Sequence, residues 1–105
     1  MYIQGNGISI HYQIDGPEDA PTVVLSHSLA ANLGMWDAQM STLLPRFRVL
    51  RYDTRGHGQT DAPSGNYTLE LLARDLFSLM DVLGIDAIHF VGLSMGGMIG
   101  QAAVL

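Results

Sequence analysis

The sequence contains no cysteine and few charged residues. Without cysteine the chain can form neither a disulfide framework nor a thiolate metal site. Charged residues make up 14% of the 105 positions, against about 25% in a typical soluble domain, while hydrophobic residues make up 48%. Few charges are therefore available to cover the surface, and we expect an exposed apolar area that associates with a partner.

Positive charge is scarce as well. Five basic residues stand against ten acidic ones, which gives a formal net charge of −5. Nucleic acids and anionic lipids bind basic surfaces, and this composition offers none. Residues 1–4 also lack the basic start and apolar stretch of a signal peptide. We therefore expect a cytoplasmic protein that acts on a small molecule and binds neither nucleic acid nor membrane.

Residues 87–105 carry no charged side chain and match a bilayer span in length. Four glycines, a serine, a glutamine and a histidine interrupt this stretch. A buried strand followed by a buried helix explains the same apolarity, and we expect that arrangement instead of a transmembrane helix.

The most informative stretch is Gly92-Leu93-Ser94-Met95-Gly96-Gly97, which follows an apolar run at 87–91. It is a G-x-S-x-G nucleophile elbow between a strand and a helix. Such a turn strains the serine backbone and exposes its hydroxyl, while Gly92 and Gly96 let strand and helix approach closely. The helix that follows directs free N–H groups towards the serine, so the N–H of Met95 is a candidate oxyanion donor. The alternative is a glycine-rich turn that contains serine by chance.

The rest of the chain alternates between strand and helix patterns. Residues 2–14 alternate apolar and polar side chains around a glycine-rich turn, which predicts an antiparallel hairpin. The later alternation of strand and helix predicts parallel strands with right-handed crossovers. The fold class is therefore α/β, a mostly parallel sheet with an N-terminal antiparallel hairpin and flanking helices. The predicted strands are 22–26, 47–52 and 87–91, and the predicted helices are 35–44 and 69–83, the latter between a Thr68 cap and Gly84.

Two polar loops follow the strands 22–26 and 47–52, at the sheet edge where open α/β sheets bind ligands. The first loop, 27–32, contains Leu29, whose N–H is the second candidate oxyanion donor. The second loop, 53–60, contains Asp53 and Arg55, which we expect to pair with each other or with backbone and to brace the site. This loop lacks the third glycine of a dinucleotide fingerprint, and no two histidines have metal-ligand spacing, so we predict no cofactor and no metal.

These motifs resemble the α/β-hydrolase superfamily in order and spacing over the whole chain. The motifs are 26–29, 53–60 and 92–97, with further similarity at 32–37 and 67–70. Within the superfamily the chain resembles the 3-oxoadipate enol-lactonases in particular, and esterases and cofactor-free haloperoxidases share these motifs.

The resemblance implies roles for individual residues. Ser94 is implied as the nucleophile, Leu29 and Met95 as the oxyanion-hole donors, and His27 as a brace of the oxyanion loop. It also implies that the strand ending at Ser26 neighbours the strand before the elbow. The His27-Ser28 pair departs from the His-Gly pair that is usual in the family.

In this family an acidic residue and then a histidine follow the nucleophile in the chain. After Ser94 this sequence has neither. We therefore expect residues 1–105 to be a single, incomplete α/β-hydrolase domain that lacks the cap and the C-terminal strands. Of the histidines present, we expect His11 and His89 to be structural, whereas His27 and His57 lie on loops. One hypothesis makes His27 a substitute base; the resemblance favours its role as a brace.

Two functions follow from this reading. The first is a serine hydrolase of small carboxylic esters or lactones, which works through an acyl-enzyme at Ser94 and is most like 3-oxoadipate enol-lactone hydrolysis. The second is a non-catalytic half-domain that associates with a complementary segment or with itself. An unpaired strand at 87–91 and an exposed apolar helix from Met98 would both promote such association.

Overall fold

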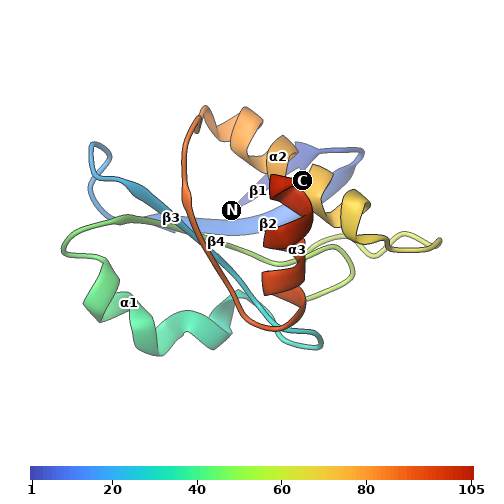
Figure 1. Cartoon of the computed structure of the whole chain (residues 1–105), viewed down its shortest axis with the longest axis horizontal. Coiled ribbons are helices and arrows are strands. Elements are labelled where there is room, and N and C mark those ends of the chain that lie inside the picture. Colours follow the sequence, from blue (N-terminus) through green and yellow to red (C-terminus); the bar gives the residue numbers. More distant parts are fainter.

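A computed structural model describes all 105 residues and contains one five-stranded sheet (Figure 1). The strand order is β1-β2-β4-β3-β5. The first two pairings are antiparallel, whereas β4, β3 and β5 run parallel to one another. This confirms the predicted α/β sheet with an antiparallel N-terminal hairpin, and it places the strand of Ser26 beside the strand that precedes the elbow. The strands are β1 (Tyr2–Gly5), β2 (Ile8–Asp15), β3 (Thr22–Ser26), β4 (Arg48–Tyr52) and β5 (His89–Gly92).

Helices cover both faces of the sheet, with α1 on one side and α2 and α3 on the other (Figure 1). The helical elements are a 3-10 turn η1 (Leu33–Trp36), α1 (Asp37–Leu43), α2 (Leu69–Leu83) and α3 (Met95–Val104). Successive strand residues point to opposite faces, so β3 contributes to two cores. Val23 and Leu25 pack with Trp36 and Met40 on the α1 side, whereas Val24 packs with the buried face of α2.

Capping residues explain where the helices begin and end. The Thr68 hydroxyl accepts a hydrogen bond from the N–H of Leu71 at 3.1 Å, and Gly84 ends α2 in the left-handed conformation, as predicted. The predicted helix 35–44 instead begins as the 3-10 turn at Leu33, because the Asn32 side chain accepts the N–H of Gly34 at 2.8 Å.

The open edge of the sheet is β5, which pairs only with β3. It begins two residues later than predicted, at His89, which is the first residue paired with β3, opposite Val23. Val91, Leu93 and Met98 along this edge and on α3 are 46%, 51% and 46% exposed. The edge therefore presents an apolar surface. No helix in the structure combines the length and the apolarity needed to cross a membrane.

Candidate active site

Ser94 occupies the turn between β5 and α3 in a backbone conformation that is unusual for a non-glycine residue. Its φ is 56° and its ψ is −113°, so the residue is strained. The residue is exposed, and its hydroxyl makes no hydrogen bond to a helix N–H. Backbone hydrogen bonds on both sides hold the turn: Leu93 N–H donates to Ser26 at 3.2 Å, and Gly96 N–H donates to Leu93 at 3.0 Å. The geometry is that of a nucleophile elbow.

Two glycines make this turn possible. A Cβ on Gly92 would lie 2.3 Å from the carbonyl carbon of Gly96, and a Cβ on Gly96 would lie 2.1 Å from the carbonyl oxygen of Ser26. Neither position has room for a side chain. The first turn of α3 therefore packs directly against the end of β3, which brings Ser94 to the loop that begins at His27.

Met95 is the first residue of α3, so its N–H has no acceptor within the helix. This N–H lies at the positive end of the helix dipole, directly after Ser94, where it can donate to an oxyanion. The structure thus gives Met95 the free donor that its predicted role requires.

The loop 27–32, which we predict to be the oxyanion loop, leaves β3 next to the elbow. Leu29 is 68% exposed, and Ala30 has a positive φ of 63°. Within the loop the N–H of Ala31 donates to Ser28 at 3.2 Å. Ser28 stands where the family usually has glycine, and its N–H donates to the sulfur of Met35 at 3.4 Å.

His27 is completely buried and uses both of its ring nitrogens. Nδ1 donates to the carbonyl of Ser28 at 2.8 Å, while Nε2 accepts the N–H of Thr54 at 2.9 Å. Burial lowers the pKa of His27 and favours this neutral form. Neither nitrogen is free to take a proton from Ser94, so these contacts support the role of a brace and oppose that of a substitute base.

Asp53 and Arg55 do not pair with each other, and this corrects one of the two pairings expected from the sequence. Arg55 makes a two-bond ion pair with Asp75 of α2, both bonds at 2.8 Å, because the loop turns towards α2 after β4. Asp53 instead accepts hydrogen bonds from backbone N–H groups, which is the other pairing that we expected. It also forms a hydrogen bond with the ring of His11. The hydrogen bond to Asp75 raises the pKa of Arg55.

No pattern in the sequence indicates that His11 contributes to this part of the molecule. Its partner is 42 residues away, and the two meet because β2 pairs with β4 in a register that sets Tyr12 opposite Tyr52. The chain position of a strand does not fix its place in a sheet. The contact could be predicted only by also predicting that the hairpin pairs with the strand 47–52.

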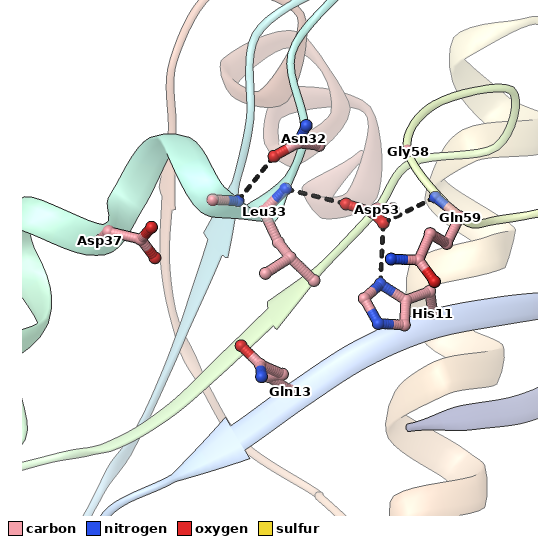
Figure 2. A pocket seen from close by; sticks show the side chains of 9 residues that line it. His11, Gln13, Asn32, Leu33, Asp37, Asp53, Gly58 and Gln59 are labelled. Atoms are coloured by element: carbon pink, nitrogen blue, oxygen red, sulfur yellow. Dashed lines mark hydrogen bonds and ion pairs between the residues drawn. The ribbon is translucent and has the colours of Figure 1, made fainter.

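Asp53 lies at the edge of a polar pocket of about 300 Å³, shown in Figure 2. Burial raises the pKa of Asp53, but hydrogen bonds from Gln59, Leu33 and His11 outweigh burial and lower it overall. The Asp53 carboxylate is therefore ionised, and it holds these three donor groups in place. Ser94 does not line this pocket, and no three His, Cys, Asp or Glu side chains gather anywhere in the chain to hold a metal ion.

Known proteins share this architecture. Residues 21–105 match the family model for the alpha/beta hydrolase fold. Over 98 residues the chain is 47% identical to 3-oxoadipate enol-lactonase 1 of Acinetobacter baylyi, an alignment that covers 93% of this chain and 36% of that protein. The chain therefore spans little more than a third of that relative's length.

Solved structures agree in shape. The crystal structure of the enol-lactonase from Burkholderia xenovorans LB400 superposes with a TM-score of 0.95 at 52% identity, covering 97% of this chain and 40% of that one. A thermophilic esterase from Thermogutta terrifontis superposes with a TM-score of 0.89 at 32% identity, covering 99% of this chain and 39% of that one.

The tight packing of the elbow predicts opposite effects for two neighbouring glycines. Gly96→Ala should lower the free energy of unfolding by about 1–3 kcal/mol, because its Cβ would overlap the Ser26 carbonyl. Gly97→Ala should be neutral or stabilising by about 0.5–1 kcal/mol, since its Cβ comes no closer than 3.4 Å to Gly92. Urea unfolding of both variants measures the difference. Equal effects would contradict the close approach of α3 to β3.

Acid should weaken the fold in two steps. The pKa of His27 is lowered in the folded chain, so below about pH 6.5 the unfolded chain gains a proton that the folded chain does not, and stability falls. The pKa of Asp53 is lowered as well, so a second loss follows below about pH 4. Urea unfolding at a series of pH values measures both. His27→Gln should abolish the first step and keep the second; a first step of unchanged size would contradict the neutral, buried His27.

Proposed function

The chain belongs to the α/β-hydrolase family, and from this we propose that it carries the nucleophile and oxyanion hole of a serine hydrolase of small carboxylic esters or lactones. The single observation that carries the proposal is the backbone of Ser94, whose strain presents the hydroxyl beside the free N–H of Met95. A serine that served only to turn the chain would not need this conformation.

The proposed reaction follows from these positions. The Ser94 oxygen attacks the substrate carbonyl and passes its proton to a base, while the carbonyl oxygen becomes an oxyanion that accepts the N–H groups of Met95 and Leu29. Collapse of this intermediate breaks the ester bond, and the base returns the proton to the departing alcohol oxygen. In a lactone that oxygen stays attached to the acyl group. Water then attacks the acyl carbonyl and passes a proton to the base. The bond between the acyl carbon and the Ser94 oxygen breaks, the base protonates that oxygen, and the carboxylic acid leaves.

The base is the part of this reaction that the described residues do not supply. Both nitrogens of His27 are engaged in hydrogen bonds to backbone. His11 and His57 bond Asp53 and the carbonyl of Arg55 through Nδ1, and neither ring is hydrogen-bonded to Ser94. His89 lies in β5 and makes no side-chain hydrogen bond that reaches Ser94. We therefore propose that a histidine and an acidic residue outside these 105 residues activate Ser94.

The apolar edge at β5 is the surface where we propose that this additional segment packs. Val91, Leu93 and Met98 are exposed there along the free edge of β5, next to Ser94. The same surface supports the second candidate, a non-catalytic half-domain that binds a complementary segment or a second copy. A specific observation keeps this candidate open: no histidine of the chain is hydrogen-bonded to Ser94.

The substrate class rests on the relatives. Two of them are named as enol-lactonases and a third as an esterase, and from this we propose a small ester or lactone, with 3-oxoadipate enol-lactone as the first compound to test. An esterase and a cofactor-free haloperoxidase are the alternatives within the family. Cytoplasmic location stays a prediction.

Labelling with a serine-directed fluorophosphonate tests the proposal, because this reagent reacts only with an activated serine. The chain is treated alone and together with a C-terminal segment of an enol-lactonase relative, and the peptide that carries Ser94 is weighed. We expect labelling at Ser94 in the assembled sample, none in Ser94→Ala, and unchanged labelling in Ser64→Ala, a control at an exposed serine outside the site. Labelling of the isolated chain would mean that this chain or a second copy of it supplies the base. Absence of labelling in both samples would refute the hydrolase and favour the half-domain.

A further inference from the structure

Two adjacent residues after β4 hold both ends of the oxyanion loop. At its start, the N–H of Thr54 donates to Nε2 of His27 at 2.9 Å. Just past its end, the N–H of Leu33 donates to Oδ1 of Asp53 at 2.8 Å. Between these points, from Ser28 to Asn32, the hydrogen bonds stay within the loop or reach the 3-10 turn η1. The position of Leu29 is therefore set by where Asp53 and Thr54 stand.

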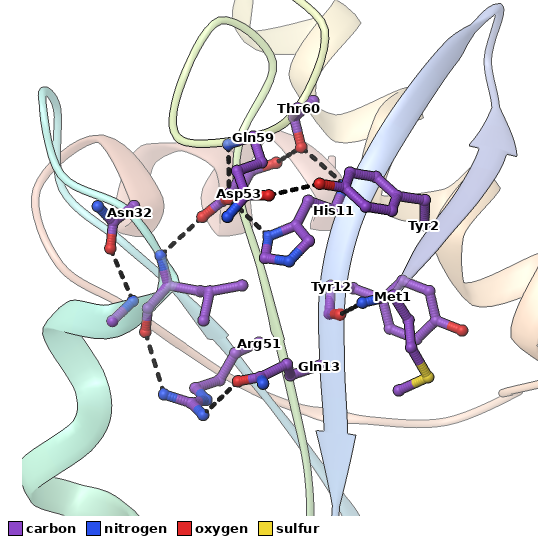
Figure 3. Close-up of polar contacts among 12 residues, drawn as sticks. Met1, Tyr2, His11, Tyr12, Gln13, Asn32, Arg51, Asp53, Gln59 and Thr60 are labelled. Carbon is purple, nitrogen blue, oxygen red and sulfur yellow. Dashed lines mark hydrogen bonds and ion pairs between the residues drawn. The ribbon is translucent and has the colours of Figure 1, made fainter.

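Asp53 in turn depends on His11 of β2, as Figure 3 shows. The ring Nδ1 of His11 lies 2.8 Å from Oδ2 of Asp53, and the N–H of Gln59 donates to the same oxygen at 2.9 Å. The side chain of Asp53 is almost completely buried, and that of His11 is mostly buried. A buried carboxylate with every donor in place cannot rotate without losing one, so the ring fixes the plane of the carboxylate.

Surrounding groups leave His11 and Asp53 no alternative arrangement. A Cβ on Gly58 would lie 2.3 Å from Oδ2 of Asp53, so the loop closes tightly over the carboxylate. The ring of Tyr2 packs on His11 with centroids 5.0 Å apart, and its hydroxyl bonds Gln59. The imidazole is thus held on one side by an aromatic ring and on the other by the carboxylate.

We propose that His11 is a positioning residue for the oxyanion hole: by orienting Asp53 it fixes the N–H of Leu33, and through the loop that of Leu29. The effect of His11 on the reaction rests on the proposed hydrolase function, whereas its effect on the loop can be measured separately. His11 touches neither Ser94 nor the candidate donors, and acts only through Asp53.

The backbone pairing of this region survives a change of the His11 side chain, which makes the ring testable. The N–H of Asp53 donates to the carbonyl of His11 at 3.0 Å, and the N–H of His11 donates to the Thr60 hydroxyl at 2.9 Å. These bonds need no imidazole. A substitution at His11 therefore removes one donor to Asp53 and leaves the strand pairing in place.

The test compares His11→Phe, which keeps a ring for Tyr2 but has no donor, with His11→Asn, whose amide N–H can replace Nδ1–H. Amide hydrogen exchange is read at Leu33, whose N–H donates to Asp53. We expect exchange at Leu33 to rise about tenfold or more in His11→Phe and to stay near wild type in His11→Asn. Exchange at Leu79, in the core of α2, should stay unchanged in both variants.

The reaction is then read as the fluorophosphonate labelling of Ser94 in the assembled sample. The first-order rate constant for labelling should fall roughly tenfold to a hundredfold in His11→Phe, because a donor to the transition state is displaced. The reagent concentration that gives half-maximal rate should stay unchanged. His11→Asn should recover most of the rate. A purely structural ring would be replaced by Phe at least as well as by Asn, so equal behaviour of the two variants overturns the proposal.

Other outcomes are equally decisive. Unchanged Leu33 exchange in His11→Phe overturns the proposal, and so does faster exchange with an unchanged labelling rate. If wild type never labels, the hydrolase function fails, and the exchange at Leu33 alone decides whether His11 positions the loop. If His11→Phe does not fold, His11→Ala is tested with two added compounds. Imidazole should slow exchange at Leu33. 1-Methylimidazole, which has no N–H when neutral, should leave that exchange unchanged. Equal effects of the two compounds overturn the proposal.

Discussion

The contact between Gly96 and the carbonyl of Ser26 is the constraint on which the site depends. A Cβ would come within 2.1 Å of that oxygen, so the helix after the elbow lies directly on the end of β3. This one approach sets two chain segments side by side. One carries Ser94 and the N–H of Met95, and the other begins the loop with Leu29. The two proposed halves of the oxyanion hole therefore meet only because glycine occupies position 96.

A second set of interactions determines the shape of the loop that arrives there. Burial lowers the pKa of His27 and keeps it neutral, and each of its two nitrogens has a backbone partner. Hydrogen bonds lower the pKa of Asp53 against the effect of burial and keep it charged. Buried polar groups of this kind stabilise only while every member is satisfied. The network therefore specifies a single loop conformation. Ser94, by contrast, is exposed and strained, which fits a residue whose role is to react.

Much of this could be predicted from local sequence. The elbow, the hairpin, the Thr68 and Gly84 caps and the strands 22–26 and 47–52 are set by neighbours within a few residues, so their patterns suffice. The partners of Asp53 and Arg55 could not be found in this way. His11 reaches Asp53 only because β2 joins β4, and Asp75 reaches Arg55 only because α2 covers that face of the sheet. Those contacts depend on sheet order, which local patterns leave open.

The measurement that tests the central claim most directly is a crystal structure of the Ser94 phosphonate adduct in the assembled hydrolase. The phosphonyl oxygen stands for the oxyanion of the tetrahedral intermediate. If Ser94, Met95 and Leu29 form the site described, that oxygen should lie about 2.7–3.1 Å from the backbone nitrogens of both Met95 and Leu29. An oxygen that points to solvent, or that contacts only one of the two nitrogens, would contradict it.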